Sequence, residues 1–468
     1  MLSLSKAAYS MMKEWKAVFR QERTMMRAIR LALCLLLNPS RNTITQSRVY
    51  GGLEDLDWSS DYKLLSRAKW NDEELFMPVI EEVIPYFEDS YISLAVDDTK
   101  VKKTGKKIPF TQYYADAMSP AFRYNLIWGH RILQISALLP LYEQEIVDHD
   151  DEDKLYHVSR GIPVSATNVP AVKKPGRKAG EEELEAYKQS KKQSNLSLAF
   201  VHIVQRVREH FDQAGAEDKT LLIVADGSFC NSTVFKADLD RISIVARCRK
   251  DASLCHRAEA PSRCYYSKET FTPQSVRQDE DIPYKKTKLF IGKKLRTVRY
   301  KEVDKVLWQR GAGRQELRLI VIAPKPYKSY GRKQNYKKEA YILTNDHTLS
   351  AEVLIQQYIN RWEIEVNHRD EKNNLGLGQA QVWNMNAVIK APALLIAAYS
   401  IMLLVSLKCY GIHRGDGYMP QPKWRKGSIR PSCNDMVNLM RKELAADEEL
   451  QKELNLYINK RAGMAVNQ

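Results

Sequence analysis

Cysteine is scarce in this chain and follows no regular spacing. There are seven cysteines among 468 residues. An odd number without a repeated spacing does not make a disulfide framework, so a reducing compartment is expected. The one cluster comprises Cys248, Cys255, His256 and Cys264 and lacks a C-x2-C pair. We therefore expect small buried residues there, with a structural zinc site as the less favoured alternative.

A clear membrane-spanning run is also lacking. The segment APALLIAAYSIMLLVSL at 391–407 has 17 uncharged residues, which is at the short limit for crossing a bilayer. It contains Pro392, Tyr399 and two serines, so we expect a buried core helix and no membrane partner. The first 37 residues place their apolar run after a charged helical stretch and show no small-residue cleavage site, so a signal peptide is not expected.

Acidic residues are outnumbered by basic ones, 57 against 73, which gives a formal net charge of +16. A soluble chain this basic usually meets a polyanion, and nucleic acid is the first candidate. A membrane surface and plain solubility charge are the alternatives. Within 285–338 the excess is greatest, with 18 Lys or Arg against three acidic residues. Hydrophobic residues make up 44% of the chain, which predicts a folded core rather than disorder.

Composition changes along the chain, and the length predicts roughly two to four structural units. We expect a helical N-terminal region (1–90), the first part of an α/β core (91–250), a basic β-rich insertion (251–338), the second part of the core (339–410) and a helical C-terminal region (411–468).

Short apolar runs indicate the buried strands of this α/β core. They are YISLAVDDT at 91–99, TLLIVADGSF at 220–229, RISIVARC at 241–248 and EAYILTN at 339–345. The segment 124–147 is expected to form two further strands. The polar stretch 150–195 is expected to be a solvated loop that leads into a helix.

Two of these strands end in aspartates, namely Asp97 and Asp98 on the first and Asp226 on the second. Cleavage of phosphodiesters with magnesium needs hard oxygen ligands that hold two ions about 3.5–4 Å apart. Carboxylates from neighbouring strand ends and one helix can converge on such a pair of ions. Strand-end aspartates alone are a weak signal, because many α/β proteins have them.

A long helix after the last strand carries the third carboxylate. Ser350 is its expected N-cap and Gly376 its expected terminator. At 3.6 residues per turn, Tyr358, Arg361, Glu365 and Lys372 lie within about 60° of arc on one face. Glu365 is the only carboxylate there, since Glu363, Asp370 and Glu371 point elsewhere. A mixed-charge stripe of this kind suits metal and phosphate, whereas a surface ion-pair network is the alternative.

The segment YINRWEIEVNHRDEK reproduces the Tyr-x2-Arg-x3-Glu-x6-Lys spacing. In this it resembles the bacterial insertion-sequence transposases with an Asp-Asp-Glu triad. AVDDT followed by KKTGKK, and LLIVADGSF, resemble the segments around the first and second catalytic aspartates of that group. The order of Asp, Asp, basic β insertion and Glu also matches. The resemblance spans roughly 91–385.

The resemblance implies an RNase H-like core, a mixed sheet flanked by helices, with a β-rich insertion. It implies that Asp98, Asp226 and Glu365 are catalytic and hold two Mg²⁺ ions, for which Mn²⁺ can substitute. Asp98 is preferred because it directly precedes a threonine, and Asp97 is its competitor. Tyr358, Arg361 and Lys372 would grip phosphates, since Arg suits bidentate phosphate contact and Lys acts as a point charge.

Some relatives stack a flipped-out base on a tryptophan, and Trp308 is the candidate here for DNA binding. A core tryptophan between β-strands is the alternative. We expect His130 to be a packed core residue, and His368 lies off the signature face.

The function that the resemblance implies is cut-and-paste DNA transposition, with cleavage of element ends and strand transfer into target DNA. The expected partners are double-stranded DNA and a second copy of the chain, in the cytoplasm near the nucleoid. The basic insertion would follow the DNA backbone, the N-terminal helices would read end sequences, and a tail helix near 434–460 would serve the dimer contact. A nuclease or resolvase on the same core, or a non-catalytic DNA-binding relative, is the alternative.

Overall fold

The computed structural model describes residues 3–116, 119–120, 122–142, 157–172, 174–176, 179–292, 294–328, 334–414, 417–421, 423–424 and 430–458. It is a mixed α/β protein. A 12-stranded mixed sheet is flanked by helices, which confirms the predicted α/β class. The strands follow the order β2-β3-β1-β5-β6-β14-β11-β10-β7-β8, with β4 paired to β3 and β9 paired to β10.

The middle of the sheet is built from the predicted apolar runs. β1 (Tyr91–Lys102) pairs antiparallel with β3 (Leu126–Tyr142) and parallel with β5 (Thr220–Ala225). β5 in turn pairs parallel with β6 (Ile242–Arg247). Side chains on both faces of β1 and β5 are buried, as expected for parallel strands that helices cover on both sides. One of these helices is α7 (Leu196–Gln213), which Asn195 caps.

The expectation for 124–147 is wrong, and that for 150–195 is wrong in part, because the predicted helix is present at Glu181–Gln193 but a strand precedes it. Within that first segment, Leu126–Tyr142 forms one long strand, β3, and residues 143–147 lie outside the described residues. Within the predicted loop 150–195, residues His157–Val169 form the buried strand β4, antiparallel to β3. Its polar residues obscure the strand pattern in the sequence, although Ser159, Arg160, Ser165 and Asn168 are all buried. The backbone of β4 also contacts α12, since the carbonyl of Gly161 accepts a bond of 3.1 Å from Asn367.

The basic segment 251–338 is β-rich, as predicted, and its strands continue the central sheet. β11 (Glu316–Ile322) pairs with β14 (Ala340–Thr344), and β14 pairs with β6. The other elements of this part are β7 (Leu254–Arg257), β8 (Tyr266–Phe271), α9 (Pro273–Gln278), β9 (Lys285–Phe290), β10 (Leu295–Leu307), α10 (Gln309–Ala312) and the β12–β13 hairpin (Lys325–Lys328 and Gln334–Lys337). A small edge strand, β2 (Gln112–Ala115), lies at the opposite end of the sheet.

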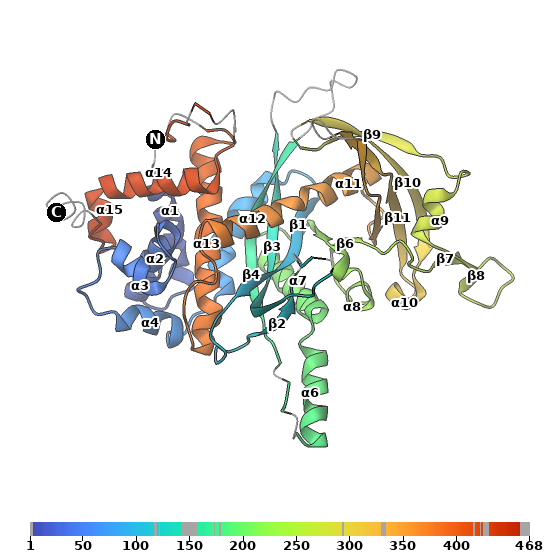
Figure 1. Ribbon diagram of the computed structural model, residues 1–468. Coiled ribbons are helices and arrows are strands. Elements are labelled where there is room, and N and C mark those ends of the chain that lie inside the picture. Colours follow the sequence, from blue (N-terminus) through green and yellow to red (C-terminus); the bar gives the residue numbers. More distant parts are fainter. Residues whose placement is uncertain are drawn as a thin grey trace.

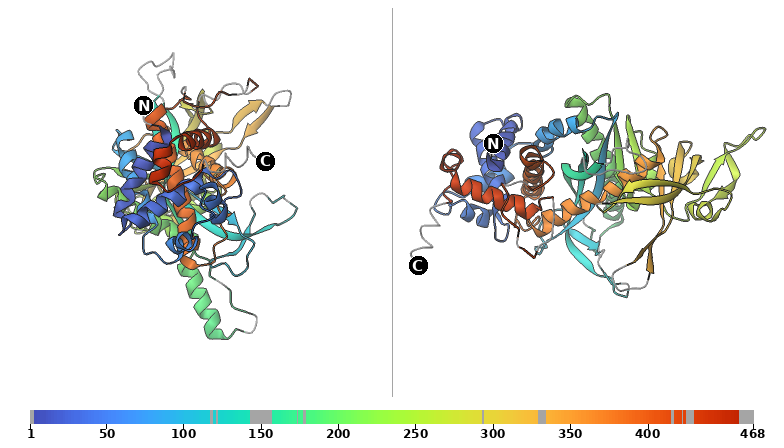
Figure 2. Two further views of the ribbon diagram at one scale, coloured as in Figure 1. Left: turned by 90° about the vertical axis from the view of Figure 1, so that its left-hand side faces the viewer. Right: turned by 90° about the horizontal axis from the view of Figure 1, so that it is seen from above.

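Helices from both ends of the chain pack into one body beside the sheet (Figures 1 and 2). Its members are α1 (Leu4–Met12), α2 (Glu22–Leu37), α3 (Ile44–Tyr50), α4 (Ser59–Ser66), α5 (Met77–Val83), α13 (Met385–Tyr410), α14 (Cys433–Ala446) and α15 (Glu448–Glu453), with 3₁₀ turns at Lys13–Ala17, Glu73–Phe76 and Ile84–Tyr86. The tail is tied to the start by ion pairs of 2.9 Å from Lys6 to Asp447 and from Lys13 to Glu453. The tail helices therefore bury their apolar side chains within the same chain.

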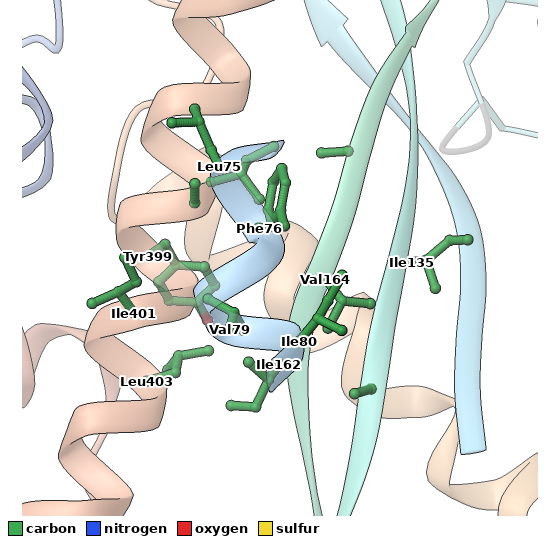
Figure 3. Packing of buried hydrophobic residues seen from close by; sticks show 14 of the residues in the cluster. Leu75, Phe76, Val79, Ile80, Ile135, Ile162, Val164, Tyr399, Ile401 and Leu403 are labelled. Atoms are coloured by element: carbon green, nitrogen blue, oxygen red, sulfur yellow. The ribbon is translucent and has the colours of Figure 1, made fainter. Parts of the chain in front are cut away.

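The apolar segment near residue 400 forms the long core helix α13. Among the described residues it is the one helix long and apolar enough to cross a membrane, and 89% of its most apolar part is buried inside the protein. Figure 3 shows Tyr399 and Leu403 of α13 directed toward the segment that carries Phe76 and Val79, whereas Ile401 lies on the other side of α13. This burial confirms the predicted core helix.

Candidate active site

The two aspartate-bearing strands end side by side. In the parallel pairing of β1 with β5, Val96 lies opposite Ala225, so Asp97 and Asp226 follow at the same edge of the sheet. Asp226 caps the turn that follows β5, where its Oδ1 accepts a bond of 2.8 Å from the Ser228 amide. The backbone register therefore brings together two carboxylates that are far apart in the sequence.

The predicted signature helix is present, but it is interrupted. Ser350 caps α11 (Ala351–Asn360) as expected, with its side chain accepting from the Val353 amide. The helix then breaks at Arg361 and continues as α12 (Trp362–Asn373), ending before Gly376. The prediction of a single uninterrupted helix is therefore wrong. Glu365 and Lys372 both lie on α12 and are seven residues apart, so they still share a face.

Packing against the sheet positions α12 over the strand ends. Ile364 forms a buried apolar cluster with Ala95 of β1 and Leu138 of β3. A methyl group at Gly161 of β4 would lie 2.8 Å from Asn367 Oδ1 and 2.9 Å from Glu363 Cβ. The absence of a side chain at Gly161 thus lets α12 approach the sheet closely and fixes the height of Glu365 above it.

Arg361 connects the helix to the strand. Its Nη2 lies 2.8 Å from Glu365 Oε1, and its Nη1 lies 3.6 Å from Asp97 Oδ2. Its guanidinium lies 6.0 Å from the centre of the Tyr358 ring. Burial lowers the pKa of the guanidinium, but Asp97 and Glu365 outweigh this effect and hold it above its ordinary value. Arg361 is therefore a buried counter-ion shared by two of the candidate carboxylates.

Asp97 and Asp98 point to opposite faces of β1, because side chains alternate along a strand. The cross-strand partner of Asp97 is Gln134, whose Nε2 donates to Glu371 of α12 at 2.9 Å. Asp97 therefore faces α12, whereas Asp98 faces the other side and lies 3.1 Å from the Nε of Arg131. Contacts with the signature helix thus favour Asp97 as the first carboxylate of the site. The catalytic role that the resemblance implies for Asp98 stays a prediction.

The electrostatics of the site follow from burial and crowding. Burial raises the pKa of Asp97 to about 7, with Asp226 and Asp98 adding to the rise and Arg361 opposing it. Burial also raises the pKa of Asp98, against the pull of Arg131. Burial lowers the pKa of Lys372, and the nearby charges of Asp97 and Asp98 oppose this. The lysine of the signature therefore lies in the field of both strand-end aspartates.

The phenol of Tyr358 belongs to the same electrostatic neighbourhood. Its pKa is raised by burial, with Arg361 and Arg247 opposing the rise and Asp226 and Glu365 adding to it. Six of the seven predicted site residues are thus gathered around the ends of β1 and β5 (Asp98, Asp226, Tyr358, Arg361, Glu365 and Lys372).

The other carboxylates of α12 have partners other than Arg361. Glu363 pairs with Arg430 at 2.6 Å, Asp370 accepts a bond of 3.0 Å from Asn374, and Glu371 is bound to Gln134. Glu365 is thus the α12 carboxylate that Arg361 joins to the strand-end aspartates.

Three residues around the site could not be found from the sequence. Arg131 and Gln134 belong to β3, which begins well after β1 in the sequence, and both lie more than 30 residues after Asp97 and Asp98. They reach these aspartates only through the register of the antiparallel β1–β3 pair. Glu371 looked like one more charge on a helix surface, yet it is fully buried. Only the period-two alternation of β3 could have indicated that Arg131 and Gln134 face opposite sides of the sheet.

The fit of a metal ion depends on the donors and on their spacing. Carboxylate oxygens are the ligands that magnesium prefers. The pKa of Asp97 is raised first by burial and then by the charges of Asp226 and Asp98, and a bound cation would oppose both effects. In the part of the chain that the structure describes, however, no group of three His, Cys, Asp or Glu side chains lies close enough to hold a metal ion. Arg361 lies between Asp97 and Glu365 instead. The donor chemistry fits a metal ion, whereas the spacing does not.

Trp308 lies apart from this site, at the start of α10. Its half-buried ring packs edge-on against Phe235, with ring centres 6.0 Å apart, and the backbone of Gly311 approaches it closely. These contacts favour the core-tryptophan alternative, and a role for Trp308 in DNA binding stays a prediction.

The histidines and cysteines also have structural surroundings. His130 is buried and its Nε2 lies 2.8 Å from the Pro109 carbonyl oxygen, so the predicted packed histidine is confirmed. Burial lowers the pKa of His368 to about 3. All seven cysteines are free thiols; Cys248 and Cys255 are buried and Cys264 is exposed. Among the described residues, these cysteines form no metal-binding group.

Comparison with known proteins adds no assignment. The chain matches no family model, and it matches no curated protein sequence.

Proposed function

We propose that the protein is a DNA transposase of the Asp-Asp-Glu type, built on an RNase H-like core. One observation carries the proposal: the ends of two adjacent parallel strands supply Asp97, Asp98 and Asp226, and α12 lies over them with the Arg-x3-Glu-x6-Lys residues of the signature directed at the same place. The mixed sheet flanked by helices supports the RNase H-like expectation.

Under this proposal each residue of the site has a distinct task. Asp226, Glu365 and one of the two β1 aspartates would hold two Mg²⁺ or Mn²⁺ ions in an arrangement in which these carboxylates lie closer together than here, with Arg361 no longer between them. The ions would supply charge stabilisation and an activated water for phosphodiester cleavage. Arg361, Lys372 and Tyr358 would hold phosphates of the element end. The chain would act as a homodimer on double-stranded DNA, in the cytoplasm near the nucleoid.

Exposed basic residues on the extended sheet suit the backbone of DNA. They are Lys285, Lys286, Lys294, Arg296, Arg299, Lys305, Arg310 and Arg314. By contrast, Arg27, Arg30 and Arg48 of the N-terminal helices lie next to the buried Asp61. These three arginines stabilise the helical body, so end-sequence reading would fall to other residues of that region.

Replacing two basic residues of the sheet should weaken DNA binding without regard to sequence. Lys286 and Arg299 are exposed cross-strand partners on β9 and β10. If each contacts one phosphate, K286A/R299A should reduce the slope of log K against log salt by about 2, since each phosphate contact contributes about 0.9. Titration of one duplex at several salt concentrations measures the slope. The control is K442A/K452A on α14 and α15, and an equal slope in both variants contradicts the prediction.

The deciding experiment is Mg²⁺- or Mn²⁺-dependent cleavage of DNA that carries the flanking ends of the element, with wild type beside Glu365→Ala. The wild type is expected to cut and to join the freed 3′ end to a target, while the variant binds DNA and loses about a thousandfold or more of the cleavage rate. Equal cleavage by both proteins would refute the catalytic role of Glu365. Cutting without joining would assign a nuclease.

A non-catalytic DNA-binding protein on the same core is the second candidate. It is favoured by the position of Arg361, whose single positive charge is shared by Asp97 and Glu365 where a metal ion would otherwise lie. Binding of the same DNA by wild type and Glu365→Ala, with cleavage by neither, would select it.

A further inference from the structure

One helix stands apart from the rest of the protein. α6 (Glu181–Gln193) projects away from the body in Figure 1 and in the left view of Figure 2. From Glu181 to Lys192 every side chain is exposed except that of Tyr187, which is half-buried. A helix of this length is marginally stable in water when nothing packs against it. Its exposure therefore raises the question of what it contacts.

The charges of α6 are divided between its two ends. Glu181, Glu182 and Glu183 occupy the first turn, and Lys191 and Lys192 occupy the last. This division suits the helix dipole and so helps the helix to form. It also makes one end of the helix attractive to the other end of an identical helix.

One face of α6 combines these charges with its two apolar side chains. Relative to Tyr187, the side chains of Glu183, Leu184 and Lys191 lie within about 60° on the helical wheel. Leu184 is 37% exposed. Glu182, in contrast, lies about 140° away on the opposite face. The result is a stripe with an apolar centre, an acidic end and a basic end.

We propose that α6 pairs antiparallel with α6 of a second copy of the chain, about a two-fold axis that passes near Tyr187. Antiparallel pairing brings Glu183 of each helix next to Lys191 of the other and places Leu184 and Tyr187 at the centre. Parallel pairing would bring like charges together, which is unfavourable. The occupant is a second copy because such a stripe complements itself, as an interface with two-fold symmetry requires.

Other partners fit this stripe less well. DNA would be repelled by the four glutamates of α6, Glu181, Glu182, Glu183 and Glu185, which outnumber its three lysines. The tail helices, expected above to serve a dimer contact, bury their apolar side chains within the chain. The pairing rests on the homodimer of the proposed function, whose contact it names, but it does not require catalysis.

The test is sedimentation equilibrium of the full chain at low salt and without DNA, so that it does not depend on activity. Two short helices bury less area than a standard interface, and we expect a dimer with a Kd of roughly 50 μM. Glu183→Lys should weaken it about tenfold, because two symmetry-related attractions become repulsions. Lys191→Glu should do the same. The double variant E183K/K191E, and an equimolar mixture of the two single variants, should restore it.

Glu182→Lys is the matched control, because it changes the net charge as Glu183→Lys does but lies on the other face. It should change the Kd less than twofold. Since α6 buries none of its side chains, thermal unfolding of the body should be the same in every variant. A wild-type chain that stays monomeric at roughly five times the expected Kd, equal effects of Glu182→Lys and Glu183→Lys, or failure of the double variant to restore the dimer would each overturn the proposal.

Discussion

Replacing Asp97 with asparagine is expected to lower the rate of DNA-end cleavage about a thousandfold or more, whereas Asp98→Asn should lower it by no more than about tenfold. Both changes remove one negative charge and keep the size of the side chain. The different outcomes therefore depend on which face of β1 holds the catalytic carboxylate.

The contacts of the two aspartates give the physical reason. Asp97 shares the counter-ion Arg361 with Glu365 and lies on the side of the sheet that α12 covers. Its pKa is raised to about 7 by burial and by the charges of Asp226 and Asp98, so it belongs to a crowded acidic site. Asp98 forms an ion pair with Arg131 on the other side, where it has a structural partner in the absence of any ligand.

Cleavage rates under single-turnover conditions, with DNA binding and thermal unfolding measured in parallel, distinguish the two assignments. A larger loss for Asp98→Asn would contradict the prediction from the structure. It would support the assignment from the resemblance, in which the aspartate next to the threonine is the catalytic one. Equal large losses would mean that both carboxylates act at the site.

The sequence alone predicted those helices and strands whose apolar residues follow a clear local pattern. The apolar runs of β1, β5, β6 and β14 predicted strands because central strands that are covered on both sides of the sheet are apolar on both faces. The cap at Ser350 and the burial of α13 were also predicted from local pattern. Each of these features depends on residues close together in the chain.

Features that depend on distant partners were missed. The serine, asparagine and arginine residues of β4 suggested a loop in the sequence. They are buried because β4 pairs with β3 and α12 packs against it. The helix breaks at Arg361, whose side chain contacts Asp97, and the good helix propensity of arginine does not predict a break there. The pairing of Asp98 with Arg131 depends on strand register, which no local pattern determines.

Glu371→Gln is expected to stabilise the protein at alkaline pH and to leave its stability nearly unchanged near pH 5. Glu371 belongs to α12 and is fully buried, and this burial raises the pKa of its carboxyl group from an ordinary 4.5 to about 8. The bond from Gln134 and the charge of Lys372 oppose the rise, and Asp370 adds to it. The folded protein therefore holds this proton over a pH range in which the unfolded chain has lost it.

A raised pKa in the folded state gives a stabilising contribution that is complete below about pH 4.5 and is lost as the pH rises through 8. Glutamine has nearly the same shape and carries no charge at any of these pH values, so it avoids the loss. The free energy of unfolding of Glu371→Gln should therefore exceed that of the wild type by up to roughly 4 kcal/mol at pH 8.5, and by little at pH 5.

Denaturant unfolding of both proteins at the two pH values measures the difference, with the exposed Glu81→Gln on α5 as the control for a general charge effect. If Glu371→Gln changes stability equally at both pH values, Glu371 is ionised in the folded protein and Lys372 compensates its charge. In that case the two neighbours form an ion pair, and Lys372 is less available to hold a phosphate. The pH dependence of this one variant therefore also tests whether the signature lysine is free for the task proposed for it.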